Sequence, residues 1–67
     1  MARYALVVFP IPLDKSFCYS VPQELRDKVR RGVRVIAPFG RRHEEGYVIE
    51  TPDRPNYPEE ELKQILD

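Results

Sequence analysis

The chain has 67 residues, 42% of them hydrophobic and 33% charged, and its 11 basic side chains balance its 11 acidic ones. We expect a single domain over 1–67 with a thin core, which leaves little room for a buried catalytic cavity. The lone cysteine, Cys18, excludes an internal disulfide and a cysteine-based metal cluster, and it fits a reducing, cytoplasmic setting. We expect neither a membrane segment nor a secretory signal, because the longest apolar run, Ala5 to Phe9, is short.

Two strands are expected in the first third of the chain. The apolar run 3–9 predicts a strand covered on both faces and ended by Pro10. A turn at 14–16 leads to the alternating segment 17–21, whose aromatic side chains share one face and leave Cys18 partly exposed on the other. Cys18 is also compatible with a small apolar filler, since no histidine lies nearby in the sequence to activate a thiol.

One short helix is expected next. Pro22 precedes the segment 23–31, in which Leu25 and Val29 lie four residues apart, and Gly32 follows it. Proline at the start and glycine at the end are typical of one or two helical turns.

A hairpin over 32–50 is the strongest structural signal. Val33, Val35, Ala37 and Phe39 fall at every second position and predict one face of a strand, and Pro38 places that strand at a sheet edge or at a bend. The run 47–49 predicts the returning strand, so the polar segment 41–45 is expected to form a long charged loop between Gly40 and Gly46. Gly40 either only starts the turn or lets a bound group approach the backbone closely.

The last third contains a proline-rich connector, 51–58, and an acidic run, 59–61. The segment 62–67 is expected to form a helical turn that runs into a final strand. The predicted fold is therefore α+β and mostly β: a small, twisted or partly closed antiparallel sheet of four to six strands with one short helix.

Charge is unevenly distributed along the chain. Positions 26–42 hold seven basic residues against one acid, whereas positions 44–67 hold eight acids against two basic residues. The basic stretch suits an anionic partner, although the two halves would also neutralise each other if they folded together. No glycine-rich phosphate loop is present, and His43 lies between charged neighbours, so we assign no catalytic residue, metal ligand or cofactor.

Five segments, in this order, resemble one known family: Leu6–Leu13, Ser16–Pro22, Gly32–Arg41, Gly46–Ile49 and Glu61–Asp67. The chain is similar to the N-terminal 3′ DNA-binding domain of the PriA family of primosomal replication-restart helicases, and the similarity covers nearly all of it. The resemblance implies an N-terminal fragment of a longer, cytoplasmic helicase that binds ATP and zinc elsewhere. The fragment itself carries no ATPase motif and is expected to be no enzyme.

The resemblance also implies a site. The family holds the 3′-terminal nucleotide of a nascent strand at stalled, forked DNA, and its pocket corresponds here to Phe17, Cys18, Gly40 and Lys63. Other primosome proteins are further possible partners. Cys18 departs from the family, which usually has an acidic residue there, so readout of the terminal base is in doubt while main-chain capture of the end is retained.

Three arginines, Arg34, Arg41 and Arg42, are expected to contact DNA phosphates. Two other readings of the chain remain open from sequence. One is an SH3-like small β-barrel for protein or RNA interaction without end recognition, and the other is a structural interface domain in a larger machine. Only the DNA-end reading requires a 3′ hydroxyl.

Overall fold

The computed structural model describes residues 2–12, 15–55, 58 and 62–67. It contains four strands in one antiparallel sheet of order β2-β1-β4-β3, together with a single 3-10 turn, η1. The elements are β1 (Tyr4–Val8), β2 (Phe17–Ser20), η1 (Gln23–Leu25), β3 (Arg34–Phe39) and β4 (Arg42–Glu50). The predicted mostly-β antiparallel sheet is confirmed. Asp14 and 59–61, to which the sequence assigns a turn and the acidic run, lie outside the described residues.

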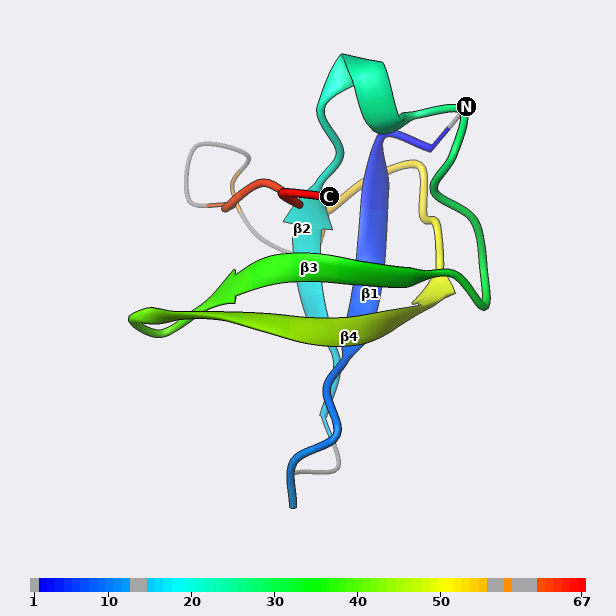
Figure 1. Cartoon of the computed structure of the whole chain (residues 1–67). Helices are drawn as coiled ribbons and strands as arrows, with labels where there is room; N and C mark the ends of the chain where they lie inside the picture. Colours follow the sequence, from blue (N-terminus) through cyan, green and yellow to red (C-terminus); the bar gives the residue numbers. More distant parts are fainter. Residues whose placement is uncertain (1, 13–14, 56–57, 59–61) are drawn as a thin grey trace.

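The sheet curls into a half-barrel instead of lying flat. In Figure 1 the β3–β4 hairpin runs across β1 and β2, and β4 is the strand that joins the two pairs. The pairing of β1 with β4 shifts register between Leu6 and Val7. An irregularity of this kind bends a strand and increases its twist, which explains the crossing of the two hairpins.

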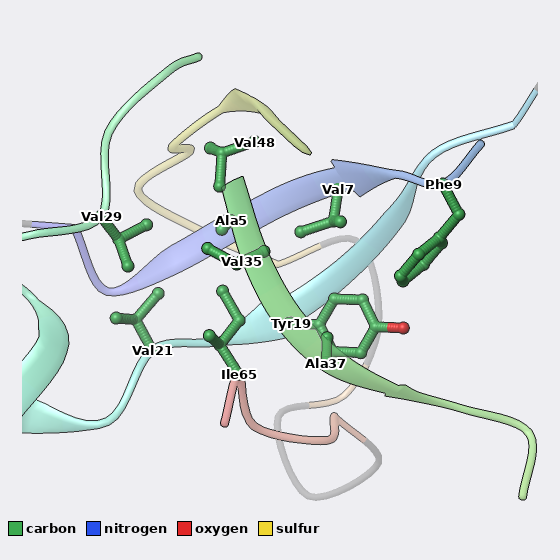
Figure 2. Close-up of a cluster of buried hydrophobic side chains, with 10 residues drawn as sticks. All are labelled: Ala5, Val7, Phe9, Tyr19, Val21, Val29, Val35, Ala37, Val48 and Ile65. Atoms are coloured by element: carbon green, nitrogen blue, oxygen red, sulfur yellow. The ribbon is translucent and has the colours of Figure 1, made fainter. Parts of the chain in front are cut away.

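The core fills the concave side of this half-barrel. Alternate residues of every strand face it, and Val29 from the turn after η1 and Ile65 from the C-terminal tail complete it. Figure 2 shows how these side chains converge. The ten buried members are Ala5, Val7, Phe9, Tyr19, Val21, Val29, Val35, Ala37, Val48 and Ile65.

The tail segment 62–67 closes the half-barrel by linking its two edge strands. On one side, the Ser20 N–H donates to the Lys63 carbonyl oxygen over 3.0 Å, and the Ile65 N–H donates to the Ser20 carbonyl oxygen over 3.0 Å. On the other side, the Leu66 N–H donates to the Ile36 carbonyl oxygen over 2.8 Å. The predicted final strand is therefore a single parallel bridge between Ser20 and Gln64, because each edge strand offers the tail only one residue.

The hairpin predicted over 32–50 is present, but the prediction was wrong about its tip. Phe39 pairs directly with Arg42, so Gly40 and Arg41 form a two-residue turn, and residues 42–45 of the segment expected to be a charged loop belong to β4. Gly40 has φ +63, while no described non-glycine residue has positive φ, and glycine at the first central position is the type II′ preference. Gly40 therefore does start the turn, whereas close approach of a bound group to its backbone stays a prediction.

Gly46 has a different reason to be glycine. It lies within β4, where a Cβ would come 2.7 Å from Val7 Cγ1 and 2.8 Å from the Val8 carbonyl oxygen. The absence of a side chain lets β4 cross β1 at contact distance. Gly46 was expected to end a loop; it is instead buried where the two hairpins meet.

Three other expectations need correction. The predicted helix over 23–31 is reduced to the 3-10 turn η1. This turn is too short to cross a membrane, and the described part of the chain contains no helix long and apolar enough to do so. β1 is fully covered on one face only, because Leu6 and Val8 are half-exposed on the other. Cys18, expected to be partly exposed, is buried at 7% exposure.

Candidate nucleic-acid interface

The two edge strands separate where the tail no longer lies between them. β2 and β3 are the edges of the sheet, and the tail pairs with each at one residue, Ser20 and Ile36. Towards Phe17 on β2 and Phe39 on β3 this pairing ends, and the strands bound a cavity of about 340 Å³. The lining residues are Phe17, Cys18, Tyr19, Pro38, Phe39, Gly40, Leu62 and Lys63.

All four residues assigned to the DNA end by the resemblance, namely Phe17, Cys18, Gly40 and Lys63, line this one cavity. They come from β2, from the hairpin turn and from the tail, which are separated by 22 positions or more along the chain (40 − 18 and 63 − 40). The fold therefore brings the predicted site residues together. Their contact with a nucleotide stays a prediction.

Main-chain groups of β2 point towards the cavity. In the antiparallel ladder with β1, alternate residues direct their N–H and C=O groups to opposite sides, and Ser20 directs both of its groups away from β1 to the tail. Cys18 is two residues earlier and therefore presents its N–H and C=O at the same edge, beyond the reach of the tail. A donor and an acceptor on the same residue suit a hydroxyl group, which both donates and accepts.

Pro38 occupies the corresponding place on β3. It lies two residues after Ile36, so its backbone faces the same edge, and the missing N–H of proline leaves no ladder hydrogen bond unmade. Its carbonyl oxygen accepts a 2.6 Å hydrogen bond from the Tyr19 hydroxyl across the cavity. Burial raises the pKa of Tyr19 to about 12, so this hydroxyl is a protonated donor at neutral pH.

An aromatic cluster forms the floor of the cavity. The Phe39 ring lies 4.8 Å from the Phe9 ring and 5.1 Å from the Phe17 ring, centroid to centroid, and meets Phe17 edge to face. Tyr19 also contacts Phe9 edge to face. Such packing fixes Phe17 and Phe39, both half-exposed, as a rigid apolar surface. The sequence alternation identified these side chains as core, and nothing in it marked Tyr19, Pro38, Phe39 or Leu62 as lining a site.

The three arginines predicted to contact phosphate do not lie together. Arg41 and Arg42 are exposed at the hairpin turn next to Gly40. Arg34 starts β3, about 16 Å along the strand from Phe39, and its Nε lies 3.3 Å from Glu45 Oε2 with 63% of the Arg34 side chain exposed. Arg34 is therefore remote from the cavity, whereas Arg41 and Arg42 adjoin it.

Fold and site together define a small β domain in which an open sheet edge and an aromatic floor adjoin exposed guanidinium groups, a combination that suits a nucleic-acid chain. A family model described as the 3′DNA-binding domain (3′BD) of PriA matches residues 6–67. The chain belongs to this family and is a DNA-binding module of the replication-restart type.

Three curated relatives share this region, and each is a replication restart protein PriA. That of Haemophilus influenzae is 35% identical over 60 residues, or 90% of this chain. That of Bacillus subtilis is 31% identical over 55 residues, or 82% of the chain, and that of Treponema pallidum is 45% identical over 49 residues, or 73% of the chain. The matched regions span only 7–8% of the length of these relatives. The family match does not favour a generic SH3-like barrel.

Proposed function

We propose that this domain holds the 3′-terminal nucleotide of a DNA strand in the cavity between β2 and β3, and so recognises a free 3′ end at forked DNA. The observation that carries the proposal is the register of β2, which directs the N–H and C=O of Cys18 to the sheet edge beside the cavity. A 3′ hydroxyl satisfies both groups. Main-chain groups also bind without regard to the base, as a reader of any arrested strand requires.

The rest of the cavity supports the same ligand. The half-exposed rings of Phe17 and Phe39 provide an apolar contact for the sugar or the base. Lys63 is exposed at the rim and supplies a positive charge for the phosphate on the 5′ side of the terminal sugar. Its backbone carbonyl is held by Ser20, so the position of Lys63 is set by the main chain.

The side chain of Cys18 affects how strongly the domain discriminates among terminal bases. Its thiol is only a weak donor and a weak acceptor, in contrast to the carboxylate usual in the family. We therefore expect capture of the end with little discrimination among the four bases.

The wider context also belongs to this proposal. As part of a replication-restart helicase, the domain would place the nascent 3′ end while ATP-driven unwinding and contacts with other primosome proteins occur elsewhere in the longer protein. The domain itself then acts only by binding the 3′ end and requires no cofactor.

A fluorescence-anisotropy titration tests the proposal with oligonucleotides that end in a 3′ hydroxyl or a 3′ phosphate. A 3′ phosphate brings charge and bulk to a position where Cys18 offers groups for a hydroxyl, and an unsatisfied polar group costs about 1–3 kcal/mol, or roughly 5- to 150-fold in affinity. Equal affinity for the two ends would rule out end recognition.

Lys63→Gln and Lys28→Gln form a matched pair for this titration. Both lysines are exposed, but only Lys63 lines the cavity, and Lys28 follows η1. We expect Lys63→Gln to weaken binding of the hydroxyl-ended strand and Lys28→Gln to leave it nearly unchanged. Gly40 variants are less informative, because any L-residue at φ +63 also strains the hairpin turn.

A further inference from the structure

A second hollow adjoins the end-binding cavity on the other side of Phe39 and Gly40. Its volume is about 450 Å³, and it is lined by Ile11, Phe39, Gly40, Arg41, Arg42 and Glu44. Phe39 and Gly40 line both spaces. A DNA strand that leaves the first cavity over Phe39 and Gly40 would therefore enter the second hollow directly.

The register of the hairpin explains why these side chains converge. Phe39 pairs with Arg42, so both lie on the concave face of the sheet, and Glu44 follows on the same face two residues later. Ile11 reaches the hollow from the end of β1, where its N–H donates to the Phe9 carbonyl oxygen over 2.8 Å. The hollow is therefore built from residues held by strand pairing and by the aromatic cluster.

The lining of this second hollow has an apolar part and a basic part. Ile11 and the half-buried Phe39 ring form an apolar part, and the exposed guanidinium groups of Arg41 and Arg42 form a basic part. Rings for stacking beside cations for phosphates are the combination that binds single-stranded nucleic acid. The Glu44 carboxylate, half-buried in the same hollow, repels a phosphate and thereby favours the arrangement with the base inside and the phosphate at the arginines.

We propose that this hollow binds the nucleotide preceding the 3′-terminal one, with its base against Phe39 and Ile11 and its phosphate at Arg41 and Arg42. The inference rests on the proposed function and extends it from one nucleotide to two. It also fixes the direction of the strand, which passes from the cavity over Gly40 towards the hairpin turn. Arg34, at the other end of β3, then lies outside the path of the strand.

The test changes the DNA, so that the fold is untouched. Single-stranded octanucleotides carry an abasic site either at the penultimate position or four positions further from the 3′ end, and each is prepared with a 3′ hydroxyl and with a 3′ phosphate. Loss of one stacked base weakens binding by about fivefold or more. We expect that loss for the penultimate abasic site in the hydroxyl-ended strand and none for the distant one.

Arg42→Gln and Arg31→Gln complete the experiment. Both arginines are exposed, and Arg31 lies at the opposite end of the hairpin beside Glu50 and Thr51. Removing one phosphate contact lowers the slope of log K against log salt by about 0.7 for a single strand, which we expect for Arg42→Gln and not for Arg31→Gln.

The outcomes separate the two proposals. Preference for the 3′ hydroxyl combined with indifference to the penultimate base, or an equal change of slope in both variants, overturns the second subsite and leaves end recognition intact. Equal affinity for hydroxyl and phosphate ends overturns end recognition, and with it the order of nucleotides proposed here.

Discussion

The Tyr19 hydroxyl donates a 2.6 Å hydrogen bond to the Pro38 carbonyl oxygen and so joins the two edge strands across the candidate site. The two residues are 19 positions apart and belong to different hairpins. The bond holds β2 and β3 at a fixed separation where the tail does not lie between them. The cavity thus has a side-chain link on one side and the main-chain bridge of the tail on the other.

Tyr19→Phe is expected to destabilise the fold in a pH-dependent way. At pH 7 the variant loses one hydrogen bond and leaves the Pro38 carbonyl without this donor, a cost of about 1 kcal/mol in the free energy of unfolding. Burial raises the pKa of Tyr19 from 10.0 to about 12, so the folded state holds the proton more tightly than the unfolded state. The stabilisation by Tyr19 is therefore complete below pH 10 and is lost as the pH rises from 10 to 12.

Urea unfolding of both proteins at pH 7, 9 and 11 measures this effect. The difference in unfolding free energy between wild type and Tyr19→Phe should be equal at pH 7 and 9 and smaller at pH 11. A difference that does not change up to pH 11 would show that the hydroxyl has no shifted pKa.

Gly46→Ala is expected to destabilise the domain by about 1–3 kcal/mol, the usual cost of overpacking. The added methyl group would lie 2.7 Å from Val7 Cγ1 and 2.8 Å from the Val8 carbonyl oxygen, so β4 would have to move away from β1. Gly32→Ala is an instructive comparison, because no atom lies within 4 Å there and the cost comes from φ +91 alone. Nuclear magnetic resonance shifts in β1 should change for Gly46→Ala only.

The tail is expected to be an integral part of the fold. Ile65 is 1% exposed in the core, and its truncation to alanine should cost about 2–5 kcal/mol. Leu66, 48% exposed, is the matched control, and its alanine variant should change stability by less than about 0.5 kcal/mol. Thermal unfolding compares the two variants, and equal losses would mean that the tail does not seal the half-barrel.

The packing of the tail segment 62–67 against the core should also affect DNA binding. The tail carries Leu62 and Lys63 into the cavity wall, so Ile65→Ala is expected to weaken binding of a hydroxyl-ended oligonucleotide under conditions where the domain is still folded. Leu66→Ala should bind like wild type. Unchanged binding by a folded Ile65→Ala domain would show that the tail contributes nothing to the site.

Local sequence patterns predicted the strands of this fold, because strand formation depends on alternation that can be read along the chain. Val35 and Ala37 are buried as their alternation indicates, and Pro38 lies on an edge strand as its missing N–H requires. The same patterns failed at the hairpin tip. The polar residues that suggested a loop over 41–45 are compatible with β4, since a strand that projects beyond the core can be polar on both faces.

The candidate site was predictable only through resemblance. Phe17, Cys18, Gly40 and Lys63 meet because the tail returns between β2 and β3, and a tail with one bridge to each edge has no periodic signature. Cys18 was expected to be partly exposed because strand alternation turns it away from the core face, and it is instead buried at the cavity wall. The second hollow depends on the register of Phe39 with Arg42, which the wrong loop prediction had hidden.

Cys18→Asp is expected to make end binding sensitive to the terminal base. In the wild type the thiol offers no strong hydrogen bond, so oligonucleotides that end in each of the four bases should bind with similar affinity. A carboxylate on the cavity wall accepts hydrogen bonds from base donors, and one such bond is worth about 1 kcal/mol, or roughly fivefold in affinity. The affinities for the four ends should therefore spread by about fivefold or more.

Two controls separate base readout from damage to the fold. Cys18→Ser places a neutral hydroxyl of similar size at the same position and should bind all four ends alike, whereas Cys18→Asn offers an uncharged acceptor and should give a smaller spread than the carboxylate. Thermal unfolding of each variant checks the cost of placing a polar group where Cys18 is 7% exposed. If folded Cys18→Asp binds the four ends equally, the side chain at position 18 does not face the base, and selectivity must be sought at Lys63 or Leu62 on the tail.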